Sequence, residues 1–448
     1  MSAAALSEMP RRVPLPAAAQ TLWSLFDMDS FLEYCLKRYA HERMLTFRIL
    51  GFGDIVSVFD PELVREVLTA DSEVVLGGEA TAEMLGKGLG PNSLLLLDGK
   101  RHLDTRRLLL PPFHGEAIRH HAAIVEQVTE QDVEHWPLDT PFALWPRMRE
   151  ITMEVILRTV IGVRDEERHQ RLRETLPAFT RGGVFGMVTE ERLGPLARGA
   201  LGRRLPWVRA RAEGERLLYE EIAEHRASPE DRHDVLALLT ATRHEDGSQL
   251  SDQELRDHVL TLLVAGHDTT AASLAWCFER LLRHPEALAR VREGARRQEA
   301  DEADESYLTA VVNETMRLRP VIDTIVRRLR APFELGGHRL PAGARVAALI
   351  AATQRSPRVY PDPLQFRPER FQEGQTAPYS FIPFGGGMRR CIGASFATME
   401  IKTVLQTVLR CVDLRVADPR DERPARMRSL SIVPARGARA VATATLDG

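Results

Sequence analysis

The spacing of apolar residues changes along the chain, and each change predicts a different kind of element. Over 29–41, apolar positions recur with a helical period behind an aspartate that can cap the helix. Strand-like runs at 44–50 and 55–59 flank a Gly-rich turn and predict a hairpin. A short helix is expected from Pro61. Residues 69–92 are Gly-rich and irregular, so we expect a loop region there.

A helical period dominates from residue 98 to about 284, with short breaks at Pro and Gly. The longest candidate helix spans 251–283. Acidic residues in its first turn favour a helix N-terminus, and Pro285 ends it. Because the middle of this helix is apolar, we expect it to cross the interior of the protein. Shorter helices are expected at 285–298 and 307–318.

The last third of the chain mixes strand-like and helical patterns. Strands are expected at 321–329, 333–335 and 339–346, followed by a Pro-rich coil over 356–383. A long helix is expected at 394–410, with short strands after it. The pattern therefore predicts an α+β protein that is mainly α, with a smaller β region split between the two ends of the chain.

We expect one folded domain over 29–448, preceded by an Ala- and Pro-rich tail over 1–28. A chain of 448 residues exceeds the size at which one core usually stops growing, so two sub-structures are expected within the domain. The helical body is predicted at about 98–319 and 394–410, and the β-rich part at about 44–60, 321–346 and 412–446.

Composition narrows the classes of protein that fit. The net charge is only −3 and no dense Lys/Arg block occurs, so nucleic acid is not an expected partner. Prolines break the apolar stretches near the N-terminus, which predicts a cytoplasmic protein with neither signal peptide nor membrane contact. The four cysteines form no C-x-x-C pair, which favours a reducing compartment. Only four of the 60 basic residues are Lys, a bias typical of GC-rich bacterial genomes. A monomer is expected.

The strongest chemical signal is the run FGGGMRRCIG over 384–393. Its three consecutive glycines, 385–387, allow the backbone to approach a flat ligand closely. Cys391 lies just before a predicted helix N-terminus, where the helix dipole favours a thiolate that can bind a metal. Phe384 can shield one side of the sulfur, and Arg389 can meet an anion. The alternative, a small buried cysteine behind a turn, is our interpretation of the other three cysteines, which lie in helical patterns.

A second signal lies in the middle of the longest predicted helix, over 265–270. A glycine inside a helix costs about 1 kcal/mol relative to alanine, so Gly266 suggests local unwinding or close approach to another group. Asp268 and Thr269 place an acid beside an alcohol in an apolar helix, where a water-filled groove would satisfy both. The alternative is a kinked core helix in which Thr269 bonds to its own backbone.

Phe384, Gly387, Arg389, Cys391 and Gly393 match, position for position, the haem-binding loop of the cytochrome P-450 family. The chain therefore resembles this family, and the match is highly specific. The resemblance implies the P-450 fold, with a long central helix over haem b (iron protoporphyrin IX). It also implies that the cysteine of the loop is the proximal iron ligand. In the family, the axial thiolate pushes electron density onto the iron and favours cleavage of the O–O bond.

The resemblance extends over roughly 29–434 and assigns roles outside the loop. The central helix resembles the family's oxygen-binding groove. This implies that Ala265 and Gly266 lie against the haem, that the Thr269 alcohol steadies iron-bound oxygen, and that Asp268 delivers protons from solvent. Asp268 and Thr269 are thus the expected catalytic residues.

The two haem propionates need positive partners. His102 and Arg106 lie four residues apart on one predicted helix, and the resemblance adds Arg327 and Arg389 to the same clamp. Arginine suits this role because its guanidinium binds carboxylates in a bidentate fork. A solvated basic helix face is the alternative for the flanking residues.

A structural lock is also expected. Glu314 and Arg317 lie at i and i+3 on one helix, a pattern that recurs several times in this Arg-rich chain. By resemblance, this copy pairs with Arg370 to fix the coil that leads to the cysteine.

The reaction implied is insertion of one oxygen atom from dioxygen into a C–H bond, or epoxidation of an alkene. The substrate is expected to be a lipophilic product of secondary metabolism: a terpenoid, steroid, macrocycle or fatty acid. The chain carries no flavin or iron–sulfur segment, so electrons from NAD(P)H would arrive through a ferredoxin or flavodoxin and a reductase. A basic docking patch for that partner is suggested at Arg101, Arg107, Arg390 and Lys402.

Two other classes of function stay open. One is a haem-thiolate peroxygenase or isomerase, and the other is a haem-binding sensor without turnover. The acid–alcohol pair favours oxygen activation over both. By family position, the walls of the substrate pocket are expected from 75–97, 179–206, Leu262 with Ala265, and 321–325 with Ile432. Asp323 is the acid within the last of these segments; it could anchor a hydroxyl or an amine, but it is expected to face water.

Overall fold

The computed structural model describes residues 9–85, 88–113, 116–179, 206–228, 232–297, 301–374, 376–425 and 430–444. The helices are α1 (Ala17–Phe26), α2 (Met28–Arg38), α3 (Pro61–Thr69), α4 (Gly78–Leu85), α5 (Gly99–Leu109), α6 (Glu116–Val133), α7 (Leu144–Ile156), α8 (Glu166–Thr175), α10 (Pro206–Ala227), α11 (Val235–Ala241), α12 (Asp252–Leu282), α13 (Pro285–Arg296), α14 (Glu302–Leu318), α15 (Ile350–Gln354) and α16 (Ala394–Cys411). The strands are β1 (Met44–Ile49), β2 (Gly53–Val58), β3 (Val75–Leu76), β4 (Pro141–Ala143), β5 (Thr324–Leu329), β6 (Phe333–Leu335), β7 (His338–Leu340), β8 (Arg345–Leu349), β9 (Val412–Val416), β10 (Pro424–Ala425), β11 (Val433–Pro434) and β12 (Arg439–Ala444).

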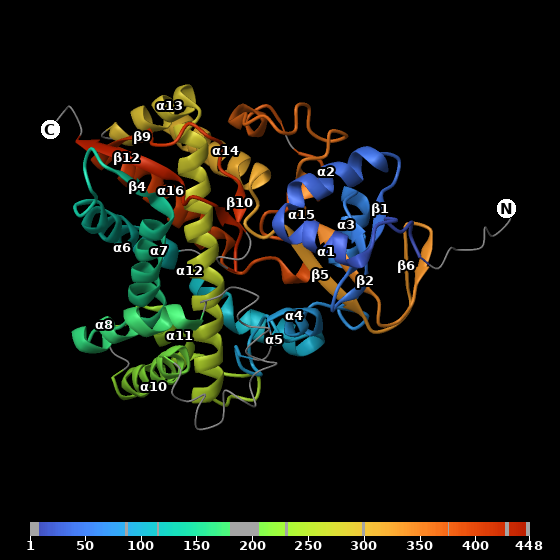
Figure 1. Cartoon of the computed structure of the whole chain (residues 1–448). Coiled ribbons are helices and arrows are strands. Elements are labelled where there is room, and N and C mark those ends of the chain that lie inside the picture. The colour runs from blue at the N-terminus through green and yellow to red at the C-terminus, as the bar shows by residue number, and fades with distance from the viewer. Residues whose placement is uncertain are drawn as a thin grey trace.

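The helical body is built around α12, which runs through its whole height in Figure 1. The helix begins with a capping box, in which Ser251 Oγ accepts from the Glu254 amide and the Glu254 carboxylate accepts from the Ser251 amide. Nearly all of its residues are buried, because other helices and strands pack around it. The predicted long central helix is confirmed. The predicted unwinding at Gly266 is wrong, because the helix is continuous from end to end.

The β-rich part lies beside the helical body, on the right in Figure 1. Its main sheet has the strand order β1-β2-β8-β5-β3, with β2 and β8 parallel and the other neighbours antiparallel. The predicted hairpin is confirmed by the pairing of β1 with β2. A second sheet, β4-β12-β9, joins segments from the middle and the end of the chain. The predicted mainly α fold with a smaller β region is therefore confirmed.

Two segments differ from the sequence-based expectation because contacts from distant residues order them. Part of the expected loop over 69–92 forms β3 and α4, and the Asp98 carboxylate accepts from three amides at the start of α4. Part of the expected tail over 1–28 forms α1. Its Gln20 side chain donates to the Val13 and Leu15 carbonyls and accepts from the Arg48 amide.

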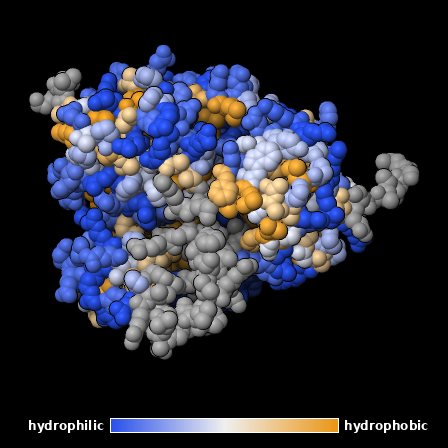
Figure 2. Space-filling view, viewed as in Figure 1, coloured by the Kyte–Doolittle hydropathy of each residue, from blue (hydrophilic) through white to orange (hydrophobic). Residues whose placement is uncertain are grey.

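Helix α1 leaves apolar side chains exposed on its outer face, at Leu22, Leu25 and Phe26. On the face drawn in Figure 2, hydrophilic residues cover most of the helical body, and apolar side chains show mainly toward the β-rich half. Among the described residues, no helix is long and apolar enough to cross a membrane.

Candidate active site

The loop over 384–393 is fixed by its own backbone. The Cys391 amide donates to the Phe384 carbonyl at 2.9 Å, and the Arg390 amide donates to the Gly387 carbonyl at 3.2 Å. Gly387 has a φ of +63°, and a Cβ there would overlap the carbonyl oxygen of Leu68 at the end of α3. Only glycine therefore allows the loop to press against α3 in this conformation.

The Cys391 sulfur is a thiol whose ionisation is opposed by its surroundings. The residue keeps an accessible face, yet burial raises the pKa of its thiol. A hydrogen bond from the Gly393 amide and the charges of Arg106 and Arg390 act in the opposite direction but do not outweigh burial. The amide at the start of α16 therefore favours the thiolate, as expected, but less strongly than burial opposes it. A bonded metal cation removes the thiol proton outright, which is the condition under which this cysteine is a ligand.

The middle of α12 has one uncovered stretch. Ala265 is exposed, Gly266 and Thr269 are partly exposed, and the residues on either side are buried. The nearest atom to a Cβ built on Gly266 would be Ile156 Cδ1, at an ordinary contact distance of 3.4 Å, so no protein group requires glycine here. Phe384 packs against the same apolar cluster as the buried residues of α12.

Thr269 bonds to the backbone of its own helix, which is one of the two arrangements that the sequence left open. Its hydroxyl donates to the Ala265 carbonyl at 2.6 Å, although the helix is not kinked there. Its oxygen lone pairs remain able to accept a hydrogen bond. The Thr269 side chain therefore lies on the uncovered face of α12, and its hydroxyl oxygen can accept a hydrogen bond.

The neighbouring acid is buried and held in place. Asp268 is 1% exposed, accepts from the Leu430 amide at 3.1 Å, and lies 3.6 Å from Nε of Arg149 on α7. Arg149 also lines a cavity of about 380 Å³ between α7 and α8, with His267 at its base. The Asp268 carboxylate thus contacts a residue that lines a space large enough for water, rather than lining a groove itself.

His267 had no predicted role, and the structure gives it a packing one. Its Nδ1 lies 2.8 Å from the Thr152 hydroxyl, and burial, helped by Arg149, lowers its pKa to about 3. It is therefore neutral at physiological pH.

The four basic residues predicted to clamp the haem propionates come together. Burial and the charges of the other members lower the pKa of His102 to about 4 and that of Arg327 to about 10. The pKa values of Arg106 and Arg389 are lowered too, first by burial. Within the described parts of the chain, Asp98 is the only carboxylate that raises any of these pKa values. The cluster is therefore short of negative charge, which fits a ligand with two carboxylates.

Asp98 stands at the start of a predicted helical stretch and was missed as a site residue. It uses its carboxylate elsewhere: Oδ1 accepts from Arg389 at 3.0 Å and from the Gly77 and Gly78 amides at 2.8 Å. Arg389 also donates to the Leu97 carbonyl at 2.5 Å. The predicted anion partner of Arg389 thus includes a carboxylate of the protein itself.

The predicted lock is confirmed by its contacts. The Glu314 carboxylate accepts from Arg317 Nε at 2.6 Å, from Arg370 Nε at 3.0 Å and from the Arg367 amide at 2.9 Å. Glu314 and Arg317 are completely buried. Arg317 also donates to the Gln354 carbonyl at 2.9 Å, so the lock fixes the coil ahead of the cysteine loop.

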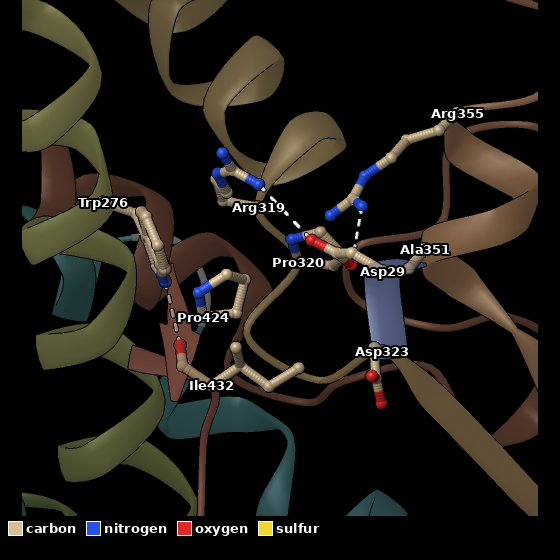
Figure 3. A pocket seen from close by; sticks show the side chains of 9 residues that line it. All are labelled: Asp29, Trp276, Arg319, Pro320, Asp323, Ala351, Arg355, Pro424 and Ile432. Atoms are coloured by element: carbon tan, nitrogen blue, oxygen red, sulfur yellow. Dashed lines mark hydrogen bonds and ion pairs between the residues drawn. The ribbon is translucent and has the colours of Figure 1, made fainter. Parts of the chain in front are cut away.

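Two predicted wall residues line a small cavity of about 10 Å³ (Figure 3). Asp323 and Ile432 lie there with Asp29, which forms ion pairs with Arg355 at 2.8 Å and Arg319 at 3.6 Å. Asp323 is partly exposed and lines this cavity, so its orientation toward water stays a prediction. Of the other expected walls, 180–205 lies outside the described residues.

Comparison with known proteins gives a consistent result. The family model for cytochrome P450 matches residues 10–439. A putative cytochrome P450 135B1 of Mycobacterium tuberculosis is 40% identical, with 100% of this chain and 94% of the relative covered. A putative cytochrome P450 137 of the same organism is also 40% identical, over 90% of this chain and 83% of the relative. A retinoic acid-bound cyanobacterial CYP120A1 superposes with a TM-score of 0.82 at 24% identity, covering 98% of this chain and 100% of that one.

Proposed function

Because this chain belongs to the cytochrome P450 family and is a P450 monooxygenase, we propose that it hydroxylates or epoxidises a lipophilic small molecule with electrons from separate redox proteins. The observation that carries this proposal is the combination around Cys391. A lone cysteine in a backbone-fixed loop lies beside basic groups that lack counter-charge.

The residues present fit a haem. Cys391 would ligate the iron, and the buried basic cluster would bind the propionates with charge-assisted hydrogen bonds. Ala265 and Gly266 leave α12 uncovered where a flat ring system could lie. Haem b with a thiolate ligand supplies dioxygen binding and cleavage of the O–O bond. Binding and orientation of the substrate, exclusion of water and proton delivery have to come from the side chains of this chain.

Proton delivery is assigned to Asp268 and Thr269. Asp268 is held by Leu430 and Arg149, and Arg149 reaches the cavity between α7 and α8. A proton from water in that cavity would reach the Asp268 carboxylate when the guanidinium moves aside. Thr269, one residue on, would hold a water or oxygen atom through its hydroxyl on the uncovered face of the helix.

Electrons are proposed to enter from the side of the cysteine loop. Arg101, Arg107 and Arg390 are exposed and could meet an acidic ferredoxin or flavodoxin reduced by an NAD(P)H-dependent reductase. Lys402, the fourth residue suggested for this patch, forms an ion pair with Glu305 and contributes less free charge. Arg107 also lies 3.5 Å from Asp104, so Arg101 and Arg390 contribute the most free charge to the patch.

The proposal is tested by the spectrum of the reduced carbon monoxide adduct. The wild-type protein is expected to give a thiolate-type Soret band, which Cys391→Ser abolishes. Cys411→Ser is the matched control, because Cys411 is a partly buried cysteine in α16. A purified protein without porphyrin, or an unaltered spectrum in Cys391→Ser, would contradict the proposal.

Turnover separates the monooxygenase from the other classes. Substrates are first found in a library of lipophilic compounds by the shift of the Soret band on binding. Product is then measured with a surrogate ferredoxin, reductase and NADPH, and separately with hydrogen peroxide alone. The monooxygenase needs the redox proteins. Full turnover with peroxide alone would instead establish a peroxygenase.

A further inference from the structure

The loop over 90–98 spans from the central helix to the cysteine loop and is bonded to both. Its first residues contact Asp257 and Thr261 of α12, and its last residues surround the guanidinium of Arg389. None of these α12 contacts belongs to the proton path described above.

Asp257 holds the first part of the loop. It is completely buried, and its Oδ2 accepts from both the backbone amide and the side-chain amide of Asn92 at 3.0 Å. Arg256 donates to Oδ1 at 2.8 Å and balances the charge. Gly90 has a φ of +90°, and a Cβ there would overlap the Asp257 carboxylate. A residue with a side chain would not fit between the backbone and this carboxylate, so position 90 requires glycine.

A pair of hydroxyl groups makes a second attachment. Thr261 Oγ1 lies 2.7 Å from Ser93 Oγ and 2.6 Å from the Asp257 carbonyl oxygen. Both side chains are buried. A hydroxyl has one proton, so Thr261 satisfies both neighbours only when Ser93 donates to it. Lifting the loop from α12 would leave both hydroxyls without their partner.

The second part of the loop orients Arg389. Its guanidinium donates to the Leu95 carbonyl at 3.0 Å, the Leu97 carbonyl at 2.5 Å and the Asp98 carboxylate at 3.0 Å. These three acceptors come from one short segment. The direction of the guanidinium therefore follows the position of the loop.

We propose that Asp257 is a positioning residue: by holding the loop over 90–98 on α12, it sets the orientation of Arg389 and thereby how firmly the basic cluster retains the haem. The link from Asp257 through the loop to Arg389 is a property of the protein atoms. Only its consequence for haem retention rests on the proposed function.

The first test compares two aspartates of α12 in the haem-loaded protein. Asp257→Asn keeps the shape of the side chain but weakens a buried charged acceptor, so exchange of the amide hydrogens over 92–97 should accelerate about tenfold or more. Transfer of haem to an excess of a haem-free globin should accelerate about tenfold as well, through the displaced Arg389. Asp252→Asn is the control, because Asp252 is exposed and pairs with Arg226 on the surface. It should leave both rates unchanged.

The second test changes the loop instead of the helix. Gly90→Ala and Gly343→Ala both place a side chain at a positive φ, but only Gly90 lies against a carboxylate, since nothing lies within 4 Å of a Cβ at Gly343. Gly90→Ala should therefore reproduce the faster amide exchange and faster haem loss of Asp257→Asn. Gly343→Ala should lower overall stability without either effect.

Two outcomes would overturn the proposal. Unchanged amide exchange over 92–97 in Asp257→Asn would show that Asp257 does not hold the loop. Faster exchange with wild-type haem loss would show that the loop does not orient Arg389. Either result overturns it. If Asp257→Asn does not fold, Thr261→Val removes the second attachment at constant volume and is subject to the same two measurements. A wild-type protein without a thiolate-type spectrum would overturn the proposed function, while the exchange measurement would still decide whether Asp257 holds the loop.

Discussion

The loop that carries Cys391 is held by its own backbone and its glycines, whereas the basic cluster beside it is assembled from three distant parts of the chain. The loop spans ten consecutive residues, and its conformation follows from Gly387 and the turn hydrogen bonds. His102 and Arg106 come from α5, Arg327 comes from β5, and Arg389 is oriented by the loop over 90–98. The ligand position is therefore fixed locally, but the counter-charge depends on the whole fold.

The two parts also differ in what they need from the cofactor. The cysteine loop has its internal hydrogen bonds in place, whereas the buried arginines repel one another and lower one another's pKa values. The protein atoms therefore specify where a haem would be bonded. The basic cluster is stabilised only when the carboxylates of a ligand bind to it.

The largest expected effect comes from the lock that supports both parts. Glu314→Ala leaves Arg317 and Arg370 buried without their carboxylate, which should cost about 3–5 kcal/mol of unfolding free energy. Denaturant unfolding measures this loss. The matched control is Glu293→Ala, which removes an exposed pair with Arg297 and should cost less than about 1 kcal/mol. Equal losses in the two variants would contradict the buried lock.

A substitution in the cysteine loop should have the next largest effect. Gly387→Ala adds a Cβ that overlaps the Leu68 carbonyl at a positive φ, so we expect a loss of about 2–3 kcal/mol and weaker haem incorporation. Gly337→Ala has the same kind of backbone strain with open space around it, and should cost about 1 kcal/mol. Calorimetry and the haem-to-protein absorbance ratio measure both effects. A similar loss in both variants would show that the contact with α3 is unimportant.

A substitution in the basic cluster should have opposite effects on the stability of the haem-free protein and on the affinity for haem. Arg327→Met removes a buried charge that the Asp98 carboxylate offsets only in part, so the haem-free protein should be unchanged or more stable. The haem-loaded protein should lose about 1.5–3 kcal/mol of haem affinity, seen as faster transfer to a haem-free globin. Arg330→Met, at an exposed pair with Glu73, is the control for both measurements. Destabilisation of the haem-free protein by Arg327→Met would contradict the unbalanced cluster.

The smallest effect is expected at the surface. Arg107→Glu should slow reduction by a ferredoxin several-fold at low ionic strength, and the difference should disappear at high salt, because the contact is electrostatic. Stopped-flow reduction under carbon monoxide measures the rate. The same slowing at every salt concentration would indicate a change in the protein core instead.

The sequence identified the parts of the site that are local. The cysteine loop and the central helix were predicted, because glycine conformations and helix spacing act over a few residues. The Glu314 lock with Arg370 was predicted only through the resemblance to the P-450 family, because its i, i+3 spacing recurs elsewhere in the chain. The order and contacts of α1 and α4 were not predicted, because Gln20 and Asp98 bond to residues that only the fold brings near.

What the sequence by itself determined is the kind of chemistry: one cysteine in a glycine-rich loop, an acid and an alcohol on a long apolar helix, and a set of basic residues. The tertiary structure decided how these groups are charged and aimed. Burial raised the pKa of the Cys391 thiol instead of lowering it, and the Asp98 carboxylate took up the guanidinium of Arg389. Desolvation and long-range partners depend on which atoms surround a group, and neighbouring residues in the chain do not specify that.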